Sequence, residues 1–266
     1  MDRPLNTNFV SKKELNHKHI AFSMARVPGS GHYYHGASDS GVYQVDHGHE
    51  NPEAKRFPAE GHSSYILGTA LNSRHLFTGG WDKNLIWWDR ETGKAARKQK
   101  AHGKWLRGVE VSPCGKQLAT VSDDMVCRIW STETGSLLAE LKGHEAQTPN
   151  NYPSMLFCAR YSPDGSRLAT GDKVGHVVIW DTESFKPLQT LDAPGHYTWD
   201  PTARRHSIGG LRSIAFSPDG KQMYTGGIHK IGNVDHLGAK ARLEIFDLET
   251  GESLAVLSGS DKCKGL

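Results

Sequence analysis

Residues 112–131, SPCGKQLATVSDDMVCRIWS, and residues 162–181, SPDGSRLATGDKVGHVVIWD, are two copies of one pattern. In both copies the tryptophan follows the serine of a Ser-Pro-x-Gly turn by 18 residues. Each copy alternates apolar and polar residues over short segments that are bounded by Gly, Pro, Asp or Asn. Such alternation is typical of strands with one buried face. The two copies therefore predict a repeated β unit.

Further copies of this unit lie on both sides of the pair. Related strands occur at 42–46, 85–89 and 243–247, and a third Ser-Pro-x-Gly turn occurs at 217–220. A Gly-His pair precedes the unit at 61–62, 143–144 and 195–196, with Ala101-His102 as a variant. His102 follows Trp88 by 14 residues, and His144 follows Trp130 by the same interval. This regular spacing indicates an array of sequence repeats.

The composition favours a globular protein without an obvious charged ligand. The 266 residues carry a formal net charge of only +3, and basic and acidic residues are interleaved, so we expect no nucleic-acid partner. No apolar run reaches the roughly 20 residues of a membrane span, so no membrane association is expected. The cysteines stand singly at 114, 127, 158 and 263, which predicts neither a disulfide framework nor a zinc site and favours the cytoplasm.

A unit of about 40 residues with Gly-His early and Trp-Asp late resembles the WD40 repeat. The resemblance covers residues from about 17 to the end, and among its members the chain looks nearer to bacterial proteins with degenerate blades. It implies an all-β fold, a WD40 β-propeller whose blades are four-stranded sheets. It implies no cofactor.

The repeats divide the chain into blades and two flanking segments. The expected segments are an N-terminal segment at 1–16, blade 1 at 17–58, blade 2 at 59–99, blade 3 at 100–141, blade 4 at 142–192, blade 5 at 193–257 and the start of a further blade at 258–266. WD40 propellers usually close with seven blades, so five blades and the start of a sixth predict a fragment of a seven-bladed ring. Such a fragment would expose an apolar blade face and self-associate. The segment 1–16 could supply a closing strand.

In the family, a histidine, a strand serine, a turn aspartate and the tryptophan form a hydrogen-bonded set within one blade, here called the blade tie. The resemblance assigns the following residues to the ties of blades 2, 3 and 4: His62, Asp82 and Trp88; His102, Ser122, Asp124 and Trp130; and His144 and Trp180. Blade 2 has Gly80 at the serine position. In blade 4, Val174 stands at the turn position and Asp172 at the serine position, and Phe246 replaces tryptophan in blade 5.

The same His, Ser and Asp residues could be read as a catalytic triad. A triad has no reason to recur in every repeat, whereas a blade tie must, so we interpret them as structural. We therefore expect no catalytic residues and no enzymatic activity. A propeller enzyme, or a regulatory segment of a larger enzyme whose catalytic domain lies beyond Leu266, remains the alternative.

Three insertions interrupt the repeat, at 146–153, at 197–206 and over most of 228–240. In the family, the loops between consecutive blades and the turns between the second and third strands of a blade emerge on one face, called the top. All three insertions should therefore meet on the top face of blades 4 and 5. Their aromatic and basic residues predict a surface that binds a protein or peptide partner, made of Tyr152, Tyr197, Trp199, Arg204, Arg205, His206, His229 and His236. The alternative is that the loops only cover weakened blades, with Trp199 packed against them.

The 15 histidines do not indicate a metal site. The close pairs in blade 1 lack a carboxylate or cysteine at a recognisable spacing, and surface or blade-tie roles fit them better. His229, Asp235 and His236 could be gathered by their loop, but we expect no metal there. The sequence is thus interpreted as a WD40 scaffold that mediates protein–protein interaction through its top-face loops.

Overall fold

The computed structural model describes residues 18–58, 61–202, 207–229 and 240–259. Within these ranges twenty strands form five four-stranded antiparallel sheets, and two short strands form a separate hairpin. The 3-10 turn η1 (Pro194–His196) is the single helical element of the described chain. The expected all-β propeller with five four-stranded blades is confirmed.

In each blade the strands follow one another from the inner to the outer edge, as adjacent antiparallel neighbours. Blade 1 contains β1 (Ala21–Arg26), β2 (His32–Ala37), β3 (Val42–Asp46) and β4 (Lys55–Arg56). Blade 2 contains β5 (Ile66–Leu71), β6 (His75–Gly80), β7 (Asn84–Asp89) and β8 (Ala95–Lys100). Blade 3 contains β9 (Leu106–Val111), β10 (Gln117–Ser122), β11 (Cys127–Ser131) and β12 (Leu137–Leu141). Blade 4 contains β13 (Leu156–Tyr161), β14 (Arg167–Asp172), β15 (His176–Asp181) and β16 (Pro187–Asp192). Blade 5 contains β19 (Leu211–Phe216), β20 (Gln222–Ile228), β21 (Ala241–Asp247) and β22 (Ser253–Ser258), and the hairpin of β17 (Tyr197–Trp199) and β18 (Ser207–Gly209) precedes it.

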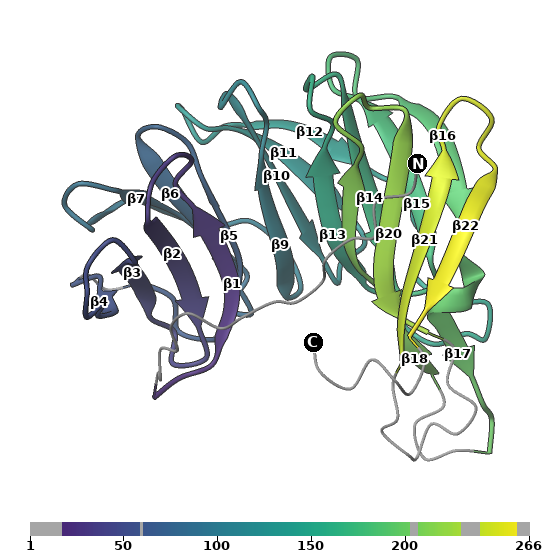
Figure 1. Ribbon diagram of the computed structural model, residues 1–266, viewed down its shortest axis with the longest axis horizontal. Coiled ribbons are helices and arrows are strands. Elements are labelled where there is room, and N and C mark those ends of the chain that lie inside the picture. The colour runs from purple at the N-terminus through teal and green to yellow at the C-terminus, as the bar shows by residue number, and fades with distance from the viewer. Residues whose placement is uncertain (1–17, 59–60, 203–206, 230–239, 260–266) are drawn as a thin grey trace, which may run out of the picture.

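The blades are arranged in sequence order around a common axis (Figure 1). Their inner strands form the wall of a channel, in which β1 contacts β5, β5 contacts β9, β9 contacts β13, and β13 contacts β19. Within the described residues, no comparable strand contact joins blade 1 to blade 5. The blades therefore form an arc whose two ends are blade 1 and blade 5.

The hydrophobic core consists of four clusters, one between each pair of consecutive blades. Trp88 packs with Ile66 and Tyr34 between blades 1 and 2, and Trp180 packs with Leu156 between blades 3 and 4. A four-stranded sheet has two apolar faces, so each blade needs a neighbour on both sides to bury them. The repeated apolar pattern is thus used for packing between blades.

The Ser-Pro-x-Gly sequences form the turns between the inner strand and the second strand of blades 3, 4 and 5. Gly115, Gly165 and Gly220 have positive φ angles of 74°, 75° and 68°. Glycine adopts this left-handed conformation without the steric cost that other residues have. These turns fix the end of the blades opposite to the insertions.

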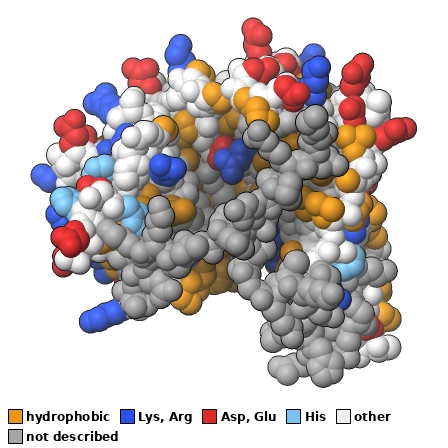
Figure 2. Space-filling model, viewed as in Figure 1, with side chains coloured by type: hydrophobic (Ala, Val, Ile, Leu, Met, Phe, Trp, Pro, Cys, Tyr) orange, Lys and Arg blue, Asp and Glu red, His pale blue; other side chains and the backbone are white. Residues whose placement is uncertain are grey.

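The two end blades expose apolar side chains. On β1, alternate residues Phe22 and Met24 are 43% and 66% exposed, and on β22, Val256 and Leu257 are 46% and 57% exposed. Two consecutive exposed residues on β22 mean that both faces of this strand reach solvent. In Figure 2, hydrophobic side chains lie around the hollow between the two halves of the arc, and charged side chains crowd the outer rim.

Two expectations fall partly or wholly outside the described residues. The possible closing strand at 1–16 lies outside them. Of the further blade expected at 258–266, only the first two residues are described, and Ser258 is the last residue of β22.

Candidate functional site

The tie residues of blades 2, 3 and 4 meet in three equivalent hydrogen-bonded sets. In blade 2, His62 Nε2 lies 2.8 Å from Thr78 Oγ1, and Trp88 Nε1–H donates to the same oxygen at 2.7 Å. His62 Nδ1 lies 2.9 Å from Asp82 Oδ1. Gly61 is required next to the histidine, because a Cβ there would lie 2.6 Å from the Trp88 ring. The set therefore joins the loop before β5 to β6, to the turn after it and to β7.

Blade 3 has the same set around Thr120 rather than around Ser122. His102 Nε2 lies 2.8 Å from Thr120 Oγ1, Trp130 Nε1–H donates to this hydroxyl at 2.9 Å, and His102 Nδ1 lies 3.1 Å from Asp124. Ser122 lies two residues further along β10 and accepts a hydrogen bond from the backbone N–H of Asp124. The prediction that Ser122 lies between histidine and tryptophan is therefore wrong, because Thr120, two residues earlier, has this role. Gly80, which stands at the serine position of blade 2, removes no member of the set.

Blade 4 forms its set with an aspartate in a different place. His144 Nε2 lies 2.8 Å from Thr170 Oγ1, and Trp180 Nε1–H donates to that oxygen at 2.9 Å. His144 Nδ1 contacts Asp172 Oδ2 at 3.0 Å, although Asp172 precedes the turn and Val174 occupies the usual position. A carboxylate two residues earlier reaches the same imidazole, so the set of blade 4 is intact.

Among the described residues, blades 1 and 5 show no complete set of this kind. In blade 5, the distance from Thr225 Oγ1 to His196 Nε2 is 3.5 Å, and Phe246 offers no indole N–H. Burial and the nearby Arg242 guanidinium lower the pKa of His196 to about 4. In blade 1, Val45 replaces tryptophan, and His35 lies 2.9 Å from His19 through their Nε2 atoms. The well-formed ties lie in the three central blades.

Electrostatics keep the tie aspartates ionised. Burial alone would raise the pKa of Asp82 and Asp124, but the contacts with His62 and His102 and the hydrogen bonds from nearby backbone N–H groups bring both pKa values well below the usual range. Arg128 adds a further contact to Asp124, with 2.9 Å between Nη1 and Oδ2. Both carboxylates form hydrogen bonds with side chains and backbone N–H groups of their own blade, so they fit a structural role.

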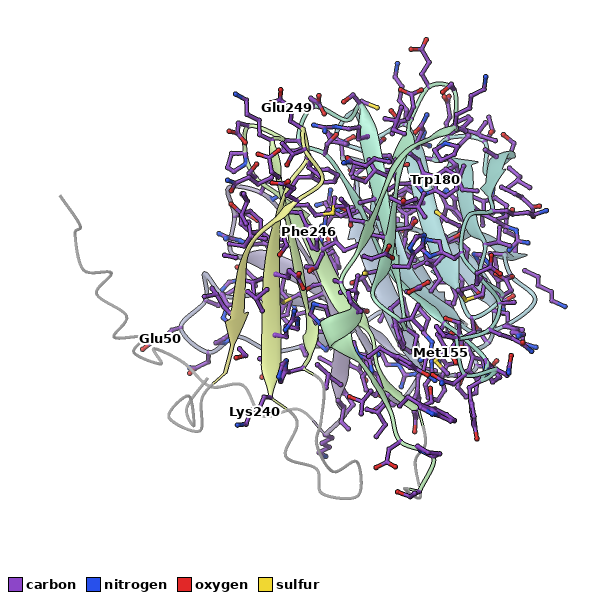
Figure 3. The ribbon with its side chains drawn as sticks, turned by 90° about the vertical axis from the view of Figure 1, so that its right-hand side faces the viewer. Glu50, Met155, Trp180, Lys240, Phe246 and Glu249 are labelled. Carbon is purple, nitrogen blue, oxygen red and sulfur yellow. The ribbon has the colours of Figure 1, made fainter. Side chains whose placement is uncertain are left out.

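The insertions of blades 4 and 5 meet on the top face. The rings of Tyr152 and Trp199 are 5.0 Å apart, and the Tyr197 hydroxyl donates to Asn150 Oδ1 at 3.3 Å. Figure 3 shows Met155 and Lys240, which flank these insertions, at the end of the blades opposite Glu249. The expected top-face clustering is thus seen for the described residues.

The other candidate partner-binding residues are placed less completely. His229 is half-buried beside the end of β20, and its backbone N–H donates to Lys240 O at 2.7 Å. Arg204, Arg205, His206 and His236 lie outside the described residues. The predicted surface is therefore described only for its aromatic part and for His229.

A second group of top-face residues lies nearer the axis and was not expected from the sequence. Trp81 and Trp105 stack with their ring centroids 4.1 Å apart and 8° between the planes, and Tyr65 contacts Trp81 at 4.8 Å. Trp105 and Tyr65 are 42% and 39% exposed. The Arg107 guanidinium lies 5.3 Å from the Trp105 centroid and binds Asp123 through two hydrogen bonds of 2.7 and 2.8 Å.

The same group continues into blades 4 and 5. Arg212 lies 4.1 Å from the centroid of the Phe157 ring, and Arg107 lies 5.6 Å from it. We call Tyr65, Trp81, Trp105, Arg107, Phe157 and Arg212 the mouth strip. Its members come from blades 2 to 5. Five of them lie in or directly before an inner strand, at its top end, and Trp81 directly follows β6. One signal in the sequence could have found part of it, because Tyr65 and Trp105 each immediately precede an inner strand.

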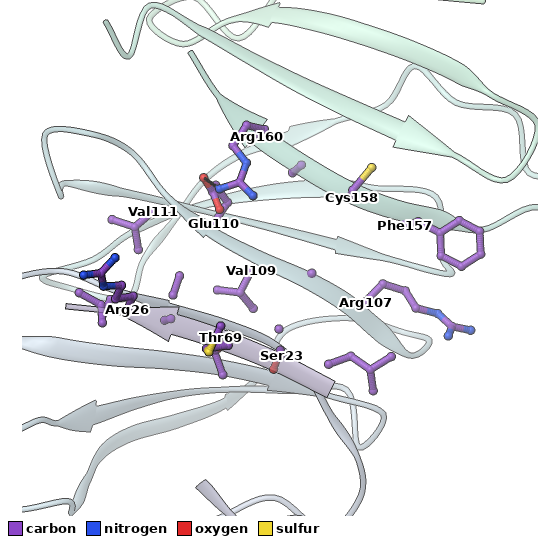
Figure 4. A pocket seen from close by; sticks show the side chains of 18 of the residues that line it. Ser23, Arg26, Thr69, Arg107, Val109, Glu110, Val111, Phe157, Cys158 and Arg160 are labelled. Atoms are coloured by element: carbon purple, nitrogen blue, oxygen red, sulfur yellow. Dashed lines mark hydrogen bonds and ion pairs between the residues drawn. The ribbon is translucent and has the colours of Figure 1, made fainter. Parts of the chain in front are cut away.

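Below the mouth strip, a cavity of about 450 Å³ runs along the inner strands. Figure 4 shows Arg160 and Glu110 pointing toward each other across it, with Arg107 beside Phe157 at one end. Arg160 Nη1 donates to Glu110 Oε1 at 2.8 Å and so joins blades 3 and 4. Burial raises the pKa of Glu110 to about 7, against the opposing charge of Arg160.

In the described part of the chain, no three His, Cys, Asp or Glu side chains converge in a way that could hold a metal ion. The described residues also contain no helical segment with the length and hydropathy of a transmembrane span. Cys127 and Cys158 are buried free thiols.

The comparisons with known proteins agree with the blade geometry. The family described as WD domain, G-beta repeat, matches residues 55–89, 93–131 and 135–181. These three matches extend from the outer strand of one blade to the third strand of the next. They therefore follow the sequence repeat, which is offset from the blades by one strand.

Several curated proteins are similar to this chain. Apoptotic protease-activating factor 1 of Rattus norvegicus is 30% identical over 59% of this chain and 12% of its own length. Nuclear distribution protein PAC1 of Arthroderma benhamiae is 28% identical over 59% of this chain and 34% of its own. WD repeat-containing protein VIP3 of Arabidopsis thaliana is 24% identical over 74% of this chain and 56% of its own.

The chain thus spans between about an eighth and just over half of the length of these relatives. They come from a mammal, a fungus and a plant, so they give no support to the expected nearness to bacterial proteins. The matched repeats, the five four-stranded blades and the recurring His–Thr–Trp sets all point to one family. Residues 55–89, 93–131 and 135–181 are therefore WD40 repeats.

Proposed function

We propose that this protein is a WD40 scaffold that binds protein partners on its top face, with the mouth strip at the centre of the binding surface. The supporting observation is the Trp81–Trp105 stack, in which Trp105 is exposed and Trp81 is half-buried, flanked by Tyr65 and Arg107. Aromatic and arginine side chains dominate the energetically important positions of protein interfaces. Exposed indole rings held rigidly lose little conformational entropy on binding.

The insertion residues extend this surface toward the edge of blades 4 and 5. The rings of Tyr152 and Trp199 contact each other, and the Tyr197 hydroxyl donates to Asn150 of the other insertion, so these side chains present a preformed aromatic patch. The proposal includes the remaining candidate residues of the insertions, Arg204, Arg205, His206, His229 and His236. In this proposal the chain performs no catalytic step. The protein acts in the cytoplasm, a compartment that keeps thiols such as that of Cys127 reduced.

The test compares one variant in the mouth strip with one far from it. Trp105→Ala should weaken the affinity for a captured partner by about tenfold or more, because an aromatic side chain that becomes buried at an interface contributes about 2 kcal/mol or more to binding. Leu188→Ala removes a side chain of β16 that is 56% exposed and should leave the affinity unchanged. Partners are identified by affinity purification, and their dissociation constants are then measured with the purified proteins. Equal affinities for Trp105→Ala and the unmodified protein would exclude the mouth strip as the binding surface.

A further inference from the structure

Two arginine side chains lie against one aromatic ring at the top of the channel, and Lys173 is close enough to interact electrostatically with one of them, Arg212. Arg107 from β9 and Arg212 from β19 both lie against the Phe157 ring. Lys173 follows β14, and Gly210 packs between it and the ring, since a Cβ on Gly210 would lie 2.4 Å from Phe157 and 3.4 Å from the Lys173 Cα. Blades 3, 4 and 5 therefore each bring one cation to the same place.

Among the described residues, a single carboxylate forms an ion pair with these three cations. Asp123 binds Arg107 in a bidentate ion pair. For Lys173 and Arg212, no carboxylate of the described chain lies within ion-pair distance. Lys173 Nζ has only the Pro153 carbonyl at 3.5 Å, and Arg212 Nη2 donates only to the Gly209 carbonyl at 3.3 Å. Neither of these two cations is therefore ion-paired within the described residues, and Asp123, which acts on Lys173 from a distance, is already paired with Arg107.

Burial and neighbouring cations destabilise the charged forms of Lys173 and Arg212. Lys173 is only 9% exposed, and its burial together with the nearby Arg212 lowers its pKa. Desolvation and the nearby Arg107 also lower the pKa of Arg212. A cation removed from water and placed near other cations is destabilised unless an anion approaches it. A ligand that brings carboxylates to this point would therefore be favoured by electrostatic complementarity.

We infer that the mouth of the channel binds an acidic peptide segment of a partner protein, whose Asp or Glu carboxylates pair with Arg212 and Lys173. The Trp81–Trp105 stack lies along the same strip and packs against the aliphatic parts of the peptide. This inference rests on the proposed function and adds the chemical class of the ligand to it.

A peptide fits the site better than a nucleic acid does. Single-stranded nucleic acids are bound along grooves in which successive cations follow the phosphate backbone. Here the two cations without an ion pair lie together, and two arginines of the adjoining wall, Arg107 and Arg160, are already paired with Asp123 and Glu110. A short segment with a few carboxylates matches such a localised pair of charges better than a continuous polyanion does.

The probe is a fluorescein-labelled flexible peptide of alternating glycine and glutamate, with the glycine–glutamine peptide as its uncharged counterpart. Fluorescence anisotropy at low ionic strength should show binding of the glutamate peptide and no binding of the glutamine peptide. Arg212→Gln should weaken binding by about tenfold or more, as expected for loss of a charge-assisted contact. Lys173→Gln tests the second cation and replaces Arg212→Gln if that variant does not fold.

Arg74→Gln is the matched control, because it changes the net charge equally in an exposed turn at the opposite end of the blades. It should bind the peptide as the unmodified protein does. Equal losses of peptide affinity in Arg74→Gln and Arg212→Gln would show that only the net charge of the protein matters, and would overturn the inference. Tighter binding of a single-stranded oligonucleotide, or binding of a phosphoserine peptide without binding of the glutamate peptide, would overturn it as well. If Trp105→Ala impairs partner binding but Arg212→Gln does not, the proposed function stands and the acidic ligand is excluded.

Discussion

At the scale of single residues, the blade ties depend on a threonine hydroxyl that the repeat pattern did not single out. Thr120 is fully buried and contacts both His102 and Trp130. Removing this hydroxyl would leave the His102 Nε2 and the Trp130 N–H without a hydrogen-bond partner, and unsatisfied polar groups in the interior destabilise the folded state. Ser122 has a weaker role, since it only accepts a backbone N–H.

We expect Thr120→Val to lower the free energy of unfolding by about 1–3 kcal/mol, because the substitution keeps the shape and removes the hydroxyl. Thr120→Ser keeps the hydroxyl and should cost less, and Ser122→Ala should cost less than Thr120→Val. Urea denaturation followed by circular dichroism measures all three. A larger loss for Ser122→Ala than for Thr120→Val would place the tie at the serine.

The tie aspartates should make stability depend on pH in the acidic range. The pKa values of Asp82 and Asp124 are lowered in the folded protein, so their stabilisation is present above the ordinary aspartate pKa near 4 and is lost as the pH falls toward their folded values. The free energy of unfolding should therefore decrease as the pH drops below about 5. Asp82→Asn should reduce the steepness of this decrease. Identical slopes for the variant and the unmodified protein would contradict the assignment.

At the scale of strands and loops, neighbouring blades are joined by apolar clusters and by the Glu110–Arg160 ion pair between β9 and β13. The mouth strip and the cavity also arise at this scale, because they need inner strands from several blades. The pKa of Glu110 is raised, mainly by burial, so the folded state disfavours its ionised form.

Because the folded pKa of Glu110 lies above its unfolded value, ionisation should destabilise the protein as the pH rises from about 4.5 to about 7. Glu110→Gln cannot ionise and should remove this part of the pH dependence. At pH 8 the variant should then be more stable than the unmodified protein by roughly 1–3 kcal/mol. Thermal or urea unfolding between pH 5 and pH 8 provides the comparison, and a variant that is less stable at pH 8 would show that the ion pair outweighs burial.

At the scale of the whole molecule, the two ends of the arc expose apolar strands. Ile20, Phe22 and Met24 of blade 1 and Leu254, Val256 and Leu257 of blade 5 are 43% to 66% exposed. Apolar surfaces of this kind and unpaired sheet faces favour association between molecules.

We expect the purified chain to self-associate in a concentration-dependent manner, which sedimentation velocity measures directly. Phe22→Lys combined with Met24→Lys should reduce association, because two charges on β1 oppose apolar contact. Leu188→Lys, on an exposed outer strand of a central blade, is the control and should have little effect. A monomer at all accessible concentrations would show that the exposed strands are not association surfaces.

The sequence by itself determined the repeat and the number of repeat units, and its resemblance to the WD40 family implied four strands in each blade. The spacing of Ser112 to Trp130, repeated from Ser162 to Trp180, sets local turns and alternating strands, and these depend on residues close in the chain. It also placed the insertions on one face, because the order of strands in a blade decides where each loop emerges.

Only the tertiary structure decided which side chains meet. Thr120 rather than Ser122 faces His102, and Asp172 contacts His144 although the usual position of the turn aspartate is occupied by Val174. The distance between side-chain atoms on neighbouring strands decides which hydrogen bonds form, and the position in the motif does not. The mouth strip could not be predicted for the same reason. Its members are spread from Tyr65 to Arg212 in the sequence and become neighbours only when four blades pack around one axis.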